Sequence, residues 1–118
     1  MAISQKAAGF KQPFRISKRT ARLVFDGIYE GAEIVVRLDV PVSIFLQIQE
    51  LIATEKQLQV FELFGNHVLD SWNIQDENGY EYSADGEGMN TIPIDLANIV
   101  LTEWVEVATQ PAAPLGGS

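Results

Sequence analysis

Apolar and polar residues alternate along two short stretches of the chain, between positions 21 and 38. This period of two predicts two half-buried β-strands. The intervening residues Y-E-G-A, at 29–32, suit a turn, because Gly31 can adopt positive φ. The pattern therefore predicts a β-hairpin, which is too small to be stable unless it packs on helices or on another chain. The apolar positions that define its inner face are Leu23, Phe25, Ile34, Val36 and Leu38.

Two segments that follow carry apolar residues at spacings of three and four, which predict helices with one apolar stripe. The first begins after Pro41, a residue that suits a first helical turn, and ends near Ala53. The second begins at residues 54–57, T-E-K-Q, which have the spacing of a capping box, and continues through Trp72. The stripes are Ile44, Phe45, Ile48, Leu51 and Ile52 in the first helix, and Leu58, Phe61, Phe64, Val68, Leu69 and Trp72 in the second.

The second half of the chain contains one further helix. Residues 75–90 are rich in acids and glycine and predict a loop, with a brief extended piece at 80–82. A third helix follows with Pro93 in its first turn; its mostly apolar side is Leu96, Ile99, Val100, Glu103 and Trp104. Gly65, within the second helix, costs about 1 kcal/mol relative to alanine. It either weakens that helix or allows a neighbouring helix to approach closely.

These elements predict an α+β fold, an N-terminal β-hairpin followed by three helices. The 118 residues suffice for one domain with one core. We assign 1–20 to a flexible basic arm, 21–110 to a single α+β domain, and 111–118 to a disordered Pro/Gly tail.

Charge is distributed unevenly along the chain. The net charge is −8, yet six of the eight basic residues lie in the first 22 positions, and no acid precedes Asp26. A folded body this acidic repels nucleic acid and membrane surfaces and suits a partner with a basic face. The arm has two alternative interpretations, an organelle transit peptide or a nucleic-acid arm. No apolar run is long enough to span a membrane, there is no cysteine, and a soluble cytoplasmic protein is expected.

No pattern of catalytic or metal-binding residues is present. His67 is the sole histidine and has no partner motif around it. The acidic loop fails the EF-hand pattern whether it is started at Asp70 or at Asp76, because Trp72 or Tyr80 falls at a ligand position. We therefore expect no catalytic residue, no metal, no cofactor and no small-molecule substrate.

Large aromatic side chains are the candidate functional residues. Trp72 and Trp104 each lie on a predicted helical stripe, where a tryptophan serves either as core or as an interface anchor. Phe61 and Phe64 lie on the same stripe as Trp72. These four residues are the predicted partner-binding set, and exposure of Phe61, Phe64 or Trp104 would be its structural sign.

Several segments occur in an order that resembles a known family. The hairpin segment is A-R-L-V-F-D-G-I-Y-E-G-A-E-I-V-V-R-L-D-V-P-V, and W-N-I-Q-D-E-N-G follows the second helix. E-G-M-N-T-I-P precedes the last helix, which contains E-W-V-E-V, and the chain closes on P-L-G-G-S. Over residues 21–118 this order resembles the tail assembly chaperones of long-tailed bacteriophages and prophages, especially those that infect actinobacteria. The basic arm has no counterpart in that resemblance.

The resemblance implies a non-enzymatic role in the bacterial host cytoplasm. Such chaperones coat the helical tape measure protein, keep it soluble and recruit tail tube subunits, and many have a longer form made by ribosomal frameshifting. Apolar stripes and net charge suit this role, since many weak contacts along a rod add up. Self-association through the hairpin edge or a helix stripe stays open.

Two other non-enzymatic functions are retained. One is a structural virion subunit of the tail tube or head–tail connector, in which the hairpin would pair between chains. The other is a small acidic protein-binding regulator that blocks a basic partner. An enzyme is disfavoured by the absence of a catalytic motif.

Overall fold

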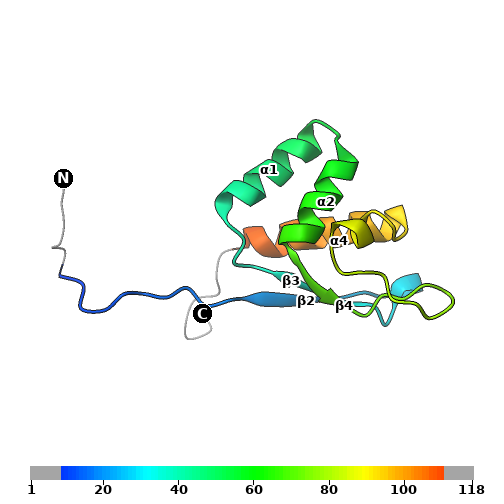
Figure 1. The fold of residues 1–118 in the computed structure, drawn as a ribbon, viewed down its shortest axis with the longest axis horizontal. Coiled ribbons are helices and arrows are strands. Elements are labelled where there is room, and N and C mark those ends of the chain that lie inside the picture. Colours follow the sequence, from blue (N-terminus) through cyan, green and yellow to red (C-terminus); the bar gives the residue numbers. More distant parts are fainter. Residues whose placement is uncertain (1–8, 111–118) are drawn as a thin grey trace.

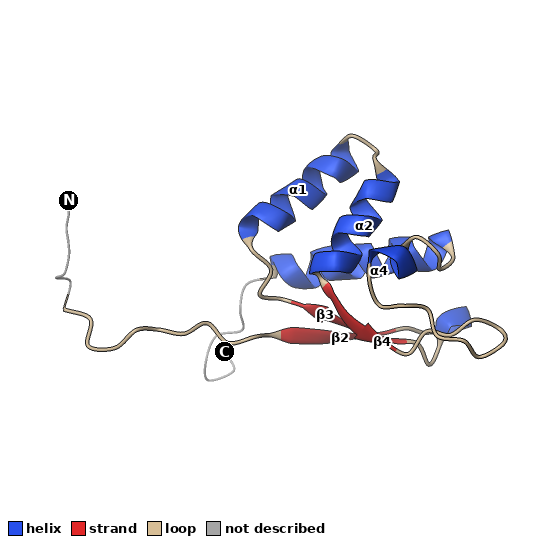
Figure 2. Ribbon diagram, in the orientation of Figure 1, coloured by secondary structure: helices blue, strands red, loops and turns tan. Residues whose placement is uncertain are grey.

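The computed structural model describes residues 9–110, which form an α+β domain preceded by an extended segment. A three-stranded antiparallel sheet in the order β2-β3-β4 forms one layer, and helices lie against one of its faces (Figures 1 and 2). The predicted fold class is confirmed. The predicted tail at 111–118 and the first eight residues of the predicted arm lie outside the described residues. The elements are β2 (Thr20–Val24), η2 (Gly27–Tyr29), β3 (Glu33–Arg37), α1 (Val42–Ala53), α2 (Gln57–His67), β4 (Leu69–Trp72), α3 (Gly86–Met89) and α4 (Ile94–Thr109).

The predicted hairpin is confirmed as β2 and β3, which pair from Thr20↔Arg37 to Val24↔Glu33. Gly31 has a φ of +99°, the left-handed region that the turn was expected to need. Alternation along β3 places Ile34 and Val36 in the core, while Val35 between them points to the other face. The connection also contains the short helix η2, which the sequence did not predict.

The prediction that the second helix continues through Trp72 is wrong. α2 ends at His67, and residues 69–72 form the edge strand β4 beside β3. The register runs Ile34↔Trp72, Val35↔Ser71 and then Val36↔Leu69, so Asp70 is an extra, bulged residue. The bulge keeps Leu69 and Trp72 on one face although they are three positions apart. A spacing of three is also a helical spacing, which is why the stripe was extended too far.

The predicted capping box at 54–57 is also wrong. Thr54 ends α1, and its Oγ1 donates a hydrogen bond to the carbonyl oxygen of Glu50 at 2.9 Å. Glu55 then adopts a φ of +58°, and α2 begins at Gln57 without a side-chain cap. The tight reversal between the two helices uses the left-handed residue Glu55. It leaves Thr54 without the extended backbone that an N-cap residue requires.

The predicted loop at 75–90 contains one turn of helix, α3, which packs closely against α2. Gly65 faces the start of α3, and a β-carbon placed on it would lie 2.4 Å from the backbone carbonyl of Asp85. The close approach considered for Gly65 is confirmed, with α3 as the neighbour. Gln75 and Glu81 form an isolated bridge near the predicted extended piece.

α4 lies along the sheet and supplies much of the core, with Leu96, Val100 and Trp104 buried. The helix begins at Ile94, directly after Pro93. Ile99 was expected on the same side but is 39% exposed, and Glu103 is half-buried, because the inner row also includes Ala97 and Leu101. Within residues 9–110, no helix is long and apolar enough to cross a membrane.

Candidate interaction surfaces

Three of the four predicted partner-binding residues are buried in the core. Phe61, Phe64 and Trp104 are 4%, 0% and 1% exposed, so the expected structural sign is not found. The Trp104 ring meets the Phe64 ring edge-on at 5.4 Å and the Phe45 ring at 5.5 Å. Its indole N–H points to the carbonyl oxygen of Arg37 at 3.4 Å. In this fold these side chains join α1, α2 and α4 to the sheet and offer no free surface to a partner.

Trp72 is half-buried and holds the acidic loop against the sheet. Its indole N–H donates to the carbonyl oxygen of Tyr82 at 2.8 Å, and its ring lies over Gly88 of α3. Asn73 continues the strand pairing: its Oδ1 accepts from the backbone N–H of Glu33, and its Nδ2 donates to the carbonyl oxygen of Gly31. The segment W-N therefore has a structural role, fixing the loop and the hairpin turn to each other.

The acidic loop uses its carboxylates in internal turns. Asp76 accepts backbone N–H groups from Asn78 at 2.8 Å and Tyr80 at 3.0 Å. Asp85 caps α3, accepting from the backbone N–H of Gly88 and from the hydroxyl of Ser83. Within residues 9–110, no group of three or more His, Asp or Glu side chains is placed to hold a metal ion.

The cap at Asp85 predicts a specific dependence of stability on pH. The bonds from Gly88 and Ser83 hold the pKa of Asp85 below its ordinary value of 3.8. Because the pKa of Asp85 is lower in the folded state than in the unfolded state, its ionised form stabilises the fold at pH values above the unfolded-state pKa. This stabilisation is lost as pH falls through the folded-state pKa. We expect Asp85→Asn to be less stable than the wild type at neutral pH, with the gap narrowing as pH falls through the lowered pKa of Asp85. Urea unfolding at neutral pH and in acid measures the gap; an equal gap under both conditions would contradict this role.

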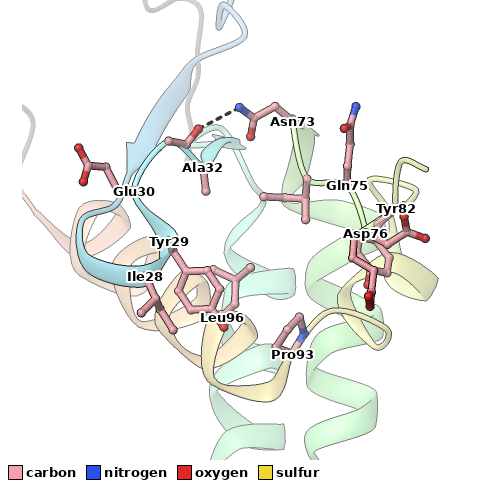
Figure 3. Close-up of a pocket in the computed structure, with 13 residues that line it drawn as sticks. Ile28, Tyr29, Glu30, Ala32, Asn73, Gln75, Asp76, Tyr82, Pro93 and Leu96 are labelled. Atoms are coloured by element: carbon pink, nitrogen blue, oxygen red, sulfur yellow. Dashed lines mark hydrogen bonds between the residues drawn. The ribbon is translucent and has the colours of Figure 1, made fainter. Parts of the chain in front are cut away.

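A cavity of about 500 Å³ lies between the hairpin turn and the residues after β4 (Figure 3). Tyr29, Asn73, Asp76 and Tyr82 contribute to its wall. Tyr29 donates its hydroxyl to Asp95 at 2.7 Å, and this bond raises the pKa of Tyr29. Asn73 and Asp76 are engaged in the turns described above.

α1 presents the most extensive exposed apolar surface of the helices. Eight of its 12 residues are apolar, yet only Ile48 is buried. Val42 and Leu46, one helical turn apart, are 72% and 58% exposed, and Ile52 near the C-terminal end of α1 is 39% exposed. Figure 2 shows α1 and α2 standing above the sheet, and more than half of the residues of α1 are exposed.

The sequence did carry a signal for this surface. Val42 and Leu46 lie outside the stripe predicted for the first helix, and apolar residues extend around most of its circumference. A helix that is apolar nearly all round needs neighbours on several sides. The domain supplies α2 and, through Phe45, one contact with Trp104 of α4. We define the α1 surface as Val42, Leu46 and Ile52, the exposed large apolar residues of α1.

No protein-family model, curated protein or solved structure matches this chain. Similarity to characterised proteins therefore assigns it no family. Function has to be argued from the order of sequence motifs and from the surfaces described above.

Proposed function

We propose that the protein is a tail assembly chaperone that binds a phage tape measure protein in the bacterial host cytoplasm, keeps it soluble and helps to recruit tail tube subunits. The proposal begins from the resemblance of residues 21–118 to that family. The observation that carries it is the α1 surface, an apolar helix face left without a neighbour. Unassembled tape measure proteins offer long apolar helical faces, and a helix of this kind can lie against such a face.

The distribution of charged residues also suits a helical partner of this kind. All 16 acidic residues lie between Asp26 and Glu106, whereas α1 itself contains a single charged residue, Glu50. An apolar contact surrounded by an acidic body favours a helix with basic flanks and disfavours nucleic acid. The acidic body also keeps a complex soluble while its apolar surfaces are covered.

The arrangement of neighbouring genes offers a first test. We expect a −1 overlapping reading frame just downstream, followed by a very long gene that encodes a coiled coil. The product of that gene, co-expressed with this chain, should co-purify with it. Mass spectrometry of purified virions should not find the chain. Its presence there in stoichiometric amounts would favour the alternative function, a tail tube or connector subunit.

The α1 surface makes a prediction at residue level. We expect Val42→Ser combined with Leu46→Ser to weaken binding to that coiled-coil product at least about tenfold, because two apolar side chains lose their burial in the complex. Both side chains are exposed, so the melting temperature should stay close to that of the wild type. Ile28→Ser, at an apolar position in η2 that is 84% exposed, is the control and should bind normally. Unchanged binding by the α1 variant would reject α1 as the contact.

A further inference from the structure

The segment before the sheet exposes three large apolar side chains, at positions 10, 14 and 16. Residues 9–17 belong to the basic arm predicted at 1–20, and the name arm is used for them below. They have no helix or strand and extend away from the N-terminal end of β2 (Figure 1). Phe10, Phe14 and Ile16 are 88%, 90% and 79% exposed. Side chains of this size gain about 1.5–3 kcal/mol each when they are buried, so an arm that exposes all three is suited to binding another surface.

The arm combines these apolar residues with positive charge. Phe10, Phe14 and Ile16 are at even positions, whereas Lys11 and Arg15 are at odd positions. In an extended chain, even and odd side chains point to opposite sides. The chain bends at Lys11 and Gln12, so this alternation holds over residues 13–17, where Phe14 and Ile16 lie opposite Arg15. The arm contains no acidic residue.

A groove on the folded domain has the complementary character. It lies between the end of β2 and the outer side of α4, and its volume is about 410 Å³. Val24 and Ile99 are exposed apolar residues in its wall, and Asp26 and Glu103 add negative charge. A second hollow on α4, lined by Asn98 and Thr102, shares Ile99 and Glu103 with it. The apolar residues of the groove are therefore bordered by acids, and polar residues of α4 continue the hollow beyond Ile99.

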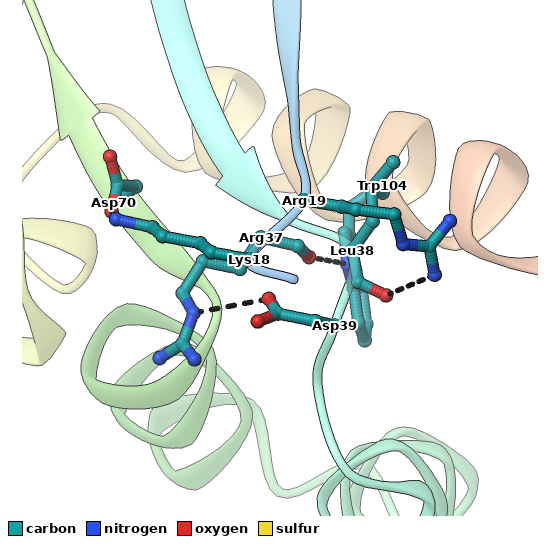
Figure 4. A network of polar contacts seen from close by, with 7 residues as sticks. All are labelled: Lys18, Arg19, Arg37, Leu38, Asp39, Asp70 and Trp104. Atoms are coloured by element: carbon teal, nitrogen blue, oxygen red, sulfur yellow. Dashed lines mark hydrogen bonds and ion pairs between the residues drawn. The ribbon is translucent and has the colours of Figure 1, made fainter. Parts of the chain in front are cut away.

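The geometry at the root of the arm directs it away from its own groove. The carbonyl oxygen of Arg19 accepts the backbone N–H of Leu38 at 2.8 Å, and Lys18 forms an ion pair with Asp70 of β4 at 2.9 Å (Figure 4). These contacts hold residues 18 and 19 in line with β2. The groove lies at the far end of β2, five strand residues away, or about 16 Å.

We propose that the arm of one chain binds in the groove of a second copy. Phe14 and Ile16 lie against Val24 and Ile99, and the basic residues of the arm neutralise Asp26 and Glu103. Residues 20–110 carry all 16 acids and three basic residues, so a basic arm is a better partner for this groove than another folded body of the same charge. The contact does not involve the α1 surface, and it stands or falls separately from the proposed function.

Molar mass of the full chain in solution is the first test. We expect the wild type to exceed the mass of a single chain at high concentration, and to fall toward it on dilution and with added salt. Phe14→Ser combined with Ile16→Ser should have the single-chain mass at all concentrations, with an unchanged melting temperature at dilutions where the wild type is also a single chain. Tyr80→Ser, which removes an equally exposed aromatic ring elsewhere, should associate like the wild type. A wild type that is a single chain throughout, or an arm variant that still associates, overturns the proposal.

A charge exchange then tests the pairing itself. Lys11→Glu with Arg15→Glu makes the arm acidic, and Asp26→Lys with Glu103→Lys makes the groove basic. Each double variant alone should be a single chain, because its arm and groove carry like charges. An equimolar mixture should associate again, since each arm then meets a groove of opposite charge. A mixture that remains single chains contradicts the assigned contact.

Discussion

Replacing Trp104 with alanine is expected to lower the free energy of unfolding by about 3–5 kcal/mol, the usual cost of removing a large aromatic side chain from a core. The indole is 1% exposed and packs between the rings of Phe45 and Phe64. Its loss leaves a cavity where α1, α2 and α4 meet, and removes the donor that faces the carbonyl of Arg37. Urea unfolding followed by far-UV circular dichroism measures the change.

Two variants separate the core role of Trp104 from a role in binding. Trp104→Phe keeps a ring in the cluster and should cost less than Trp104→Ala. Ile99→Ala, on the outer side of the same helix, should change stability by less than about 1 kcal/mol. If Trp104→Ala lost partner binding while keeping its stability, the indole would be an interface residue and its place in the core would be refuted.

Gly65→Ala is expected to destabilise the protein by more than about 2 kcal/mol, although alanine is the better helix former by about 1 kcal/mol. The new β-carbon would lie 2.4 Å from both the carbonyl carbon and the carbonyl oxygen of Asp85. Both are backbone atoms, so no side-chain rotation relieves the clash. α3 would have to move away from α2, which also breaks the bond from the backbone N–H of Gly86 to Asn66 Oδ1. The midpoint of urea unfolding reports the loss.

Gln59→Ala is the matched substitution for this prediction. Gln59 is exposed on the same helix, so alanine there brings only its helix propensity and should be neutral or slightly stabilising. Hydrogen exchange localises the effect: in Gly65→Ala, the amides of residues 86–92 should exchange faster than in the wild type. A Gly65→Ala protein as stable as Gln59→Ala would mean that α2 and α3 are farther apart than described.

The spacing of apolar residues explains which elements could be predicted from the sequence and which could not. Alternation identified β2 and β3, because each presents one face to the core for its whole length. The same reasoning failed at Leu69–Trp72, where the bulge at Asp70 gives a strand the apolar spacing of a helix. The edge of β3 carries backbone N–H and C=O groups that require hydrogen-bonding partners, and residues 69–72 supply them as β4. That need is a property of the assembled sheet, and no local pattern expresses it.

The candidate surface was harder to predict than the fold. Apolar stripes on α2 and α4 suggested Phe61, Phe64 and Trp104 as contacts, but an amphipathic stripe indicates burial without indicating what covers it. In this domain the stripes on α2 and α4 are covered by the other helices and by the sheet, whereas α1 keeps exposed apolar residues. The informative signal was the excess of apolar residues around α1, which exceeds what one neighbouring helix can bury.

The soluble yield of the tape measure protein tests the proposed function most directly. The product of the long coiled-coil gene is expressed alone, with the wild-type chain, and with the chain carrying Val42→Ser and Leu46→Ser, and its soluble fraction is measured. We predict that it aggregates alone, is soluble and co-purifies with the wild type, and aggregates with the α1 variant. The same soluble fraction with and without the wild-type chain, with no co-purification, would contradict the chaperone function.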